Sequence, residues 1–139
     1  TAGFLCWRHI QRRQYRRAAA RLLQATLAST ESDSEKLHQL NALLKRVAIY
    51  AYPQAGTAGL YGEQWLSFLQ QSAPNIAIDK TISQILTERL YNQASATAEE
   101  VVLFSRFTEN WINKHAQYSA EKIPAVNNSA EQGGQHAHL

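Results

Sequence analysis

The sequence contains no methionine and only one cysteine, Cys6, among its 139 residues. A single thiol cannot form an internal disulfide, which fits a chain that folds in a reducing compartment. Because the chain also begins Thr-Ala-Gly-Phe, we expect it to be a fragment of a longer protein. Its 45% hydrophobic content is enough for one core of ordinary size, so the sequence predicts a single domain.

Long apolar runs and catalytic motifs are also missing. No stretch of about 18 apolar residues occurs, so the printed sequence has no membrane span of its own. No Gly-x-x-x-x-Gly-Lys, His-Glu-x-x-His or Gly-x-Ser-x-Gly pattern is present. His136 and His138 could supply at most two ligands to a metal ion. We therefore expect a protein that is not an enzyme and that uses no metal, cofactor or small-molecule substrate.

Helical patterns fill most of the chain. Residues 4–28 contain no proline and are rich in alanine, leucine, arginine and glutamine, which are good helix formers. Ser32 and Thr97 each precede a glutamate by three residues, the form of a capping box. The sequence predicts an all-α fold, a compact bundle of about five helices with a long basic first helix and a disordered tail. The expected helices span 4–28, the stretch from Ser32 to Pro53, a short helix that carries Trp65, Phe68 and Leu69, 80–93 after an Asp79 cap, and 98–116.

The stretch from Tyr50 to Leu69 joins a helix-ending proline to the densest apolar cluster of the sequence. Pro53 lacks an amide hydrogen and ends the preceding helix. Gly62 permits a tight turn, after which Trp65, Phe68 and Leu69 fall on one helical face. Together with a tryptophan of the last helix they form what we call the structural hub: Pro53, Gly62, Trp65, Phe68, Leu69 and Trp111.

Apolar residues at helical spacing predict which helix faces are buried. The face expected on the first helix comprises Tyr15, Ala18, Ala19, Leu22, Leu23 and Thr26. The face expected on the last helix comprises Val101, Phe104, Thr108, Trp111, Ile112 and His115. Since His115 lies at a helix end, we interpret it as a partner of the terminal carbonyls rather than as a catalytic base.

Positive charge is concentrated at one end of the chain. Residues 1–30 carry six arginines and no acid, whereas the remainder carries eight basic and eleven acidic residues. Arg8, Arg12 and Arg16 follow one another at steps of four, and Arg13 and Arg17 lie beside them. This stripe could contact anionic lipid headgroups or nucleic-acid phosphates. We favour lipid, because the rest of the chain is acidic and no second basic surface is apparent.

Trp7 and the apolar residues around it run directly into the arginines. This change is typical of the cytoplasmic end of a membrane span, with the indole as an interfacial anchor. A solvated basic helix is the alternative. We divide the chain into a juxtamembrane helix start over 1–14, which would be the stub of a missing span, a helical domain over 15–116 and a disordered tail over 117–139.

Several segments resemble, in order and spacing, a bacterial family of unknown function. They are Arg12-Arg13-Gln14-Tyr15-Arg16-Arg17-Ala18-Ala19, residues 43–48, Tyr52-Pro53, residues 60–69 and Asn110-Trp111-Ile112. The resemblance covers about residues 8 to 116 and identifies no catalytic residue. It implies an accessory protein anchored in the bacterial inner membrane, with its domain facing the cytoplasm. It also implies gene neighbours that encode MoxR-type AAA+ ATPases and von Willebrand factor A proteins, which are the expected protein partners. The alternative function is a soluble nucleic-acid-binding helical module that uses the arginine-rich first helix.

Overall fold

The computed structural model describes the backbone of residues 2–92 and 96–115, with side chains from residue 14 onward in those ranges. The tail predicted over 117–139 lies outside the described residues. Within them every regular element is helical, as the sequence predicts. The elements are α1 (Ala2–Ala28), α2 (Asp33–Ala51), the short 3₁₀ turn η1 (Thr57–Gly59), α3 (Gly62–Ser72), α4 (Lys80–Gln84), the π-helical turn η2 (Ile85–Arg89) and α5 (Ala98–Lys114).

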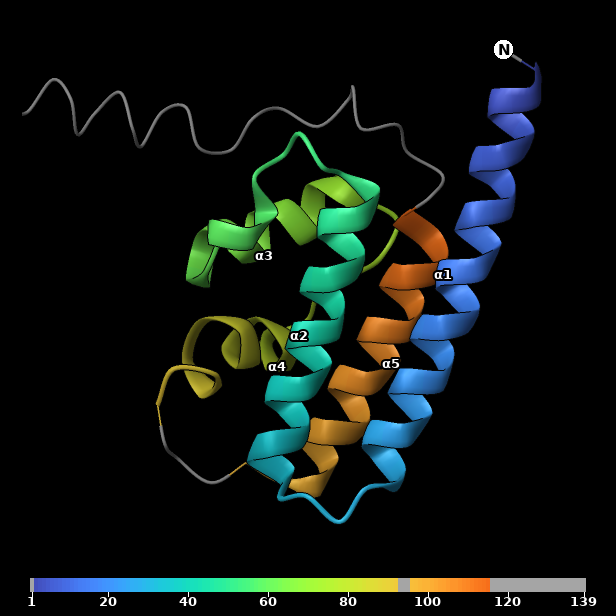
Figure 1. Cartoon of the computed structure of the whole chain (residues 1–139). Coiled ribbons are helices and arrows are strands. Elements are labelled where there is room, and N and C mark those ends of the chain that lie inside the picture. Colours follow the sequence, from blue (N-terminus) through green and yellow to red (C-terminus); the bar gives the residue numbers. More distant parts are fainter. Residues whose placement is uncertain (1, 93–95, 116–139) are drawn as a thin grey trace, which may run out of the picture.

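Three long helices form one side of the bundle and the short helices form the other (Figure 1). Helix α5 packs on α2, and α1 packs on both of them. Helices α3 and α4 lie on the side of α2 away from α1, where α3 packs on η2. The part of the hub on α3 therefore lies on the far side of α2 from the basic helix α1.

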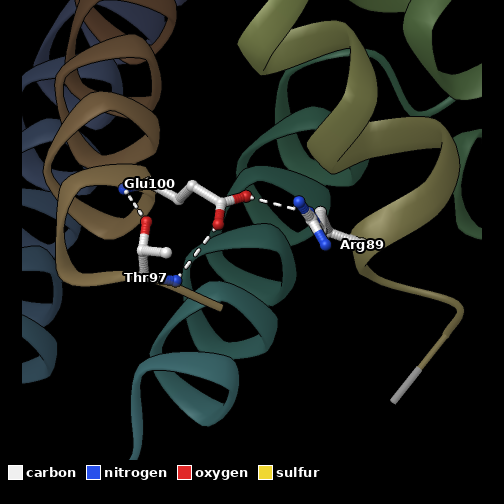
Figure 2. Close-up of polar contacts among 3 residues, drawn as sticks. All are labelled: Arg89, Thr97 and Glu100. Carbon is white, nitrogen blue, oxygen red and sulfur yellow. Dashed lines mark hydrogen bonds and ion pairs between the residues drawn. The ribbon is translucent and has the colours of Figure 1, made fainter. Parts of the chain in front are cut away.

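Capping contacts fix where the helices begin. The Ser32 hydroxyl accepts a hydrogen bond from the Glu35 amide at 3.2 Å, and the Asp79 carboxylate accepts one from the Ile82 amide at 2.9 Å. At α5 the box is complete, because the Thr97 hydroxyl accepts from the Glu100 amide while the glutamate accepts from the Thr97 amide (Figure 2). The second oxygen of Glu100 pairs with Arg89 Nε at 3.1 Å and so ties α5 to the end of η2.

Four of the six hub residues lie in the core, whereas Pro53 is exposed and Gly62 is half-buried. Trp65, Phe68, Leu69 and Trp111 are each at most 1% exposed. The Trp111 indole donates to the Ser72 hydroxyl, which in turn donates to a carbonyl of α3, so the buried polar atoms of this contact are satisfied. The remaining hub residues shape the approach to α3: α2 ends two residues before Pro53, and Gly62 has a left-handed φ of +57°.

Two details differ from the sequence prediction. Ala18 and Leu22 were expected in the core, yet both are exposed, and only Ala19 and Leu23 of that face are fully buried. Helix α1 lies at the edge of the bundle, so the part of its apolar face that reaches the core is narrower than the pattern suggests. The helix expected over 80–93 changes to a π-helical turn at Ile85 and ends at Arg89.

Candidate functional site

The arginine-bearing half of α1 extends past the end of the bundle (Figure 1). Tyr15 is level with the C-terminal end of α5, because its hydroxyl lies 3.3 Å from Nε2 of His115, the residue that follows the helix. The helix continues from there to Ala2, which is 13 residues or about 20 Å of α-helix at 1.5 Å per residue. The basic segment, residues 2–14 of α1, is therefore presented as a rod beyond the domain.

The residues predicted to contact lipid or phosphate fall into two groups, one at the base of the rod and one within it. Arg17 is exposed at the base of the rod, whereas Arg16 is half-buried beside α5 in a groove that Glu109 and Ile112 also line. The Nε atom of Arg16 has no hydrogen-bond partner among the described residues. The backbone of α1 carries the other predicted contact residues into the rod, but their side chains lie outside the described ones: Trp7, Arg8, Arg12 and Arg13.

A polar cluster fastens the base of the rod to the bundle, and we call it the clamp: half-buried Tyr15 with buried Tyr52 and His115. His115 is 1% exposed and stacks on Trp111 with ring centroids 4.2 Å apart. Its Nδ1 lies 3.1 Å from the Tyr52 hydroxyl, which also donates to the His115 carbonyl at 3.1 Å. The arrangement that uses each hydrogen once has Nδ1–H donating to Tyr52 and Tyr15 donating to Nε2. The clamp thus joins α1, the end of α2 and the end of α5.

Lys45 fastens the loop that leads into the hub. Its ammonium donates to the Thr57 carbonyl at 3.1 Å and to the Leu60 carbonyl, and it lies 4.6 Å from the centroid of the Trp65 ring. Burial lowers the pKa of Lys45 from its ordinary value of 10.5, because desolvation disfavours the charged form. Lys45 therefore acts as a structural support under η1.

Sequence reasoning placed His115 on a buried face at a helix end, but it found neither the clamp nor the role of Lys45. The partners of His115 are 63 and 100 residues away in the chain, and no local pattern pairs them. Lys45 likewise bonds carbonyls 12 and 15 residues further on.

The described residues contain no group of three or more histidine, cysteine, aspartate or glutamate side chains that could hold a metal ion. Across the same part of the chain, no helix has the length and apolar character needed to cross a membrane.

One family model matches residues 1–114, and it is described as a domain of unknown function, DUF4381. The match includes all of α1 and ends with the last residue of α5. No curated protein and no solved structure matches the chain.

Proposed function

Since the chain belongs to the DUF4381 family, whose function is unknown, we propose its role from its charge pattern and from the resemblance described above. It is a non-enzymatic accessory domain, anchored at the cytoplasmic face of the bacterial inner membrane. There it assists a MoxR-type ATPase and von Willebrand factor A proteins.

The rod carries the membrane part of this proposal. Residues 1–30 contain six arginines and no acid, and the first 13 residues of α1 extend beyond the clamp. A basic side chain near an anionic bilayer contributes about 1 kcal/mol. Several of them on a helix that leads away from the domain can hold the bundle next to lipid headgroups.

The partner part has a different support, the resemblance over residues 8 to 116. An accessory role fits a chain whose sequence carries none of the catalytic motifs considered above, and in which the clamp and the Lys45 contact hold the bundle together.

A vesicle sedimentation assay tests the membrane contact. The chain is mixed with vesicles of phosphatidylglycerol and phosphatidylcholine, or of phosphatidylcholine alone. The test variant replaces Arg8, Arg12 and Arg13 by glutamine. The matched control removes the same charge elsewhere by replacing Arg46, Lys80 and Arg106, all of which are exposed.

We expect binding to the anionic vesicles only. At about 1 kcal/mol per charge, the rod variant should bind about 100-fold more weakly, whereas the control variant should change by less than about threefold. Equal losses in the two variants would show that net charge alone drives the binding, and would refute a specific role of the rod.

The same proteins are titrated with duplex DNA and with single-stranded RNA. Nucleic-acid binding that falls steeply with salt and is lost in the rod variant, without vesicle binding, would replace the membrane proposal by the nucleic-acid alternative. The partner proposal is tested separately. The full-length natural protein should be recovered from membranes together with a MoxR-type ATPase, and membrane recovery without any such ATPase would refute that part alone.

A further inference from the structure

Two tyrosines on the side of the bundle away from α1 are unusually exposed. Tyr61, the residue before α3, is 68% exposed, and Tyr91, just after η2, is 53% exposed. Their rings make an edge-to-face contact with centroids 6.4 Å apart. The Gly62 amide donates to the Tyr91 hydroxyl at 2.9 Å, so a backbone hydrogen bond holds the Tyr91 side chain at the start of α3. The tyrosine pair is therefore a positioned surface feature rather than two independent side chains.

Carboxylates accompany both tyrosines. Glu63 lies two residues after Tyr61 in the first turn of α3, and Glu88 lies one turn before Tyr91, whose amide donates to the Glu88 carbonyl. Both glutamates are exposed, and neither has an ion-pair partner among the described residues. Arg89, which follows Glu88 in the chain, is paired with Glu100. These two carboxylates, each within three residues of one of the tyrosines in the chain, are thus available to a cation from outside.

The chain segment that contains the two tyrosines also carries a net negative charge. Residues 53–100 carry five acidic and two basic side chains, a net charge of −3. An exposed aromatic pair beside free carboxylates suits a guanidinium group. Arginine stacks on aromatic rings and can donate two parallel hydrogen bonds to one carboxylate. Lysine cannot form this paired hydrogen bond. An acidic surface also repels nucleic acid and anionic lipid.

We propose that Tyr61, Tyr91, Glu63 and Glu88 form a docking surface for an arginine-bearing segment of a partner protein. Charge complementarity and the positioned tyrosine pair select this occupant. A second copy of this chain offers its arginines on α1, on the opposite side of the bundle, so docking of two copies would be head-to-tail and would give a ring or an open filament rather than a symmetric dimer. The proposal uses only α3, η2 and the residues next to them. It therefore stands whether or not the rod contacts lipid.

The test is a titration of the isotope-labelled full chain, followed by backbone amide resonances. The probe is a capped hexapeptide of alternating arginine and alanine. A lysine version and a neutral citrulline version serve as comparisons. We expect weak, saturable binding in the millimolar range, with the largest shifts at Tyr61, Gly62 and Tyr91. The lysine peptide should bind several-fold more weakly, and the citrulline peptide should not bind.

Variants make the assignment specific. Tyr61→Ala should weaken binding by about three- to fivefold, the range of an exposed cation–π contact. Replacing Glu63 and Glu88 together by glutamine should weaken it by about tenfold. The matched control replaces Glu31 and Glu109, two exposed glutamates elsewhere, and should leave affinity within about twofold. Because the altered side chains are exposed, circular dichroism should show an unchanged fold.

Four results would overturn the proposal. Equal losses in the two glutamate variants, or equal affinity for the lysine peptide, would reduce the effect to bulk charge. Amide resonance shifts spread over all acidic segments would likewise show that bulk charge, not this surface, binds the peptide. The last result concerns a peptide copied from residues 8–21 of this chain. If it binds more tightly than the arginine-alanine probe, and the full chain self-associates in sedimentation, the surface belongs to a second copy instead.

Discussion

Removing one hydroxyl from the clamp should destabilise the domain strongly. The Tyr52 hydroxyl lies 3.1 Å from His115 Nδ1 and 3.1 Å from the His115 carbonyl oxygen, and Tyr52 is 3% exposed. Tyr52→Phe keeps the ring contacts with Phe68 and Trp111 but removes this bridge. The substitution therefore tests the hydrogen bonds with little change in apolar packing.

The size of the expected destabilisation follows from the hydrogen bonds that Tyr52→Phe removes. Removing a buried hydrogen bond costs about 1–3 kcal/mol, and Tyr52→Phe removes the hydroxyl that contacts two groups of His115. We expect a loss of roughly 2–4 kcal/mol in the free energy of unfolding. Tyr15→Phe should cost less, about 1 kcal/mol, because Tyr15 is half-buried and its 3.3 Å contact is longer.

Urea unfolding followed by far-ultraviolet circular dichroism measures these effects. For a domain of this size, Tyr52→Phe should lower the midpoint by roughly 1–2 M. In a double-mutant cycle with His115→Phe, the double variant should lose about 1–2 kcal/mol less than the sum of the single variants, since partners in one network do not act additively. Additive losses, or a change below about 0.5 kcal/mol for Tyr52→Phe, would refute the clamp as a coupled network.

Further predictions concern the supports of the hub and of α5. Because the pKa of Lys45 is lowered in the folded state, the unfolded chain binds this proton more tightly. The stability of the natural chain minus that of Lys45→Met should therefore rise as the pH increases toward 10.5. If the difference between their urea midpoints stays flat or falls with pH, the prediction is wrong. Thr97→Val should cost about 1 kcal/mol in urea unfolding by removing the hydroxyl acceptor of the Glu100 amide, and a neutral effect would show that the capping box is dispensable. Gly62→Ala should cost about 1–2 kcal/mol of stability from its positive φ alone, because an added Cβ would meet nothing within 4 Å. Gly59 is equally open and has no positive φ, so Gly59→Ala should change stability by less than about 1 kcal/mol. Thermal melts of the two variants test this, and equal costs would contradict it.

Local chemistry made much of the fold predictable. Ser32, Asp79 and Thr97 begin helices where their side chains can accept an orphan amide, and α2 ends just before Pro53. The large apolar side chains of the hub are buried because they recur at helical spacing, and a single helix cannot shield such a face from solvent.

The errors have a tertiary origin. Leu22 fits the apolar stripe of α1 as well as Leu23 does, but only the position of α1 at the edge of the bundle decides that Leu22 is 45% exposed. The π-helical turn at Ile85 has no recognisable signal in the sequence. In the candidate site, the arginine stripe is visible in the sequence because helical spacing aligns it, whereas the clamp depends on helices that meet only in the folded chain.

The central claim is that the arginine rod of α1 meets an anionic membrane while the rest of the bundle stays away from it. The single cysteine, Cys6, lies in the rod segment and allows one environment-sensitive fluorophore to be attached there. A matched label is placed on the exposed Gln70 of α3 by combining Cys6→Ala with Gln70→Cys. With vesicles that contain phosphatidylglycerol, the Cys6 label should enter a less polar environment and the Gln70 label should not change. The opposite pattern, or no response at either position, would contradict the account.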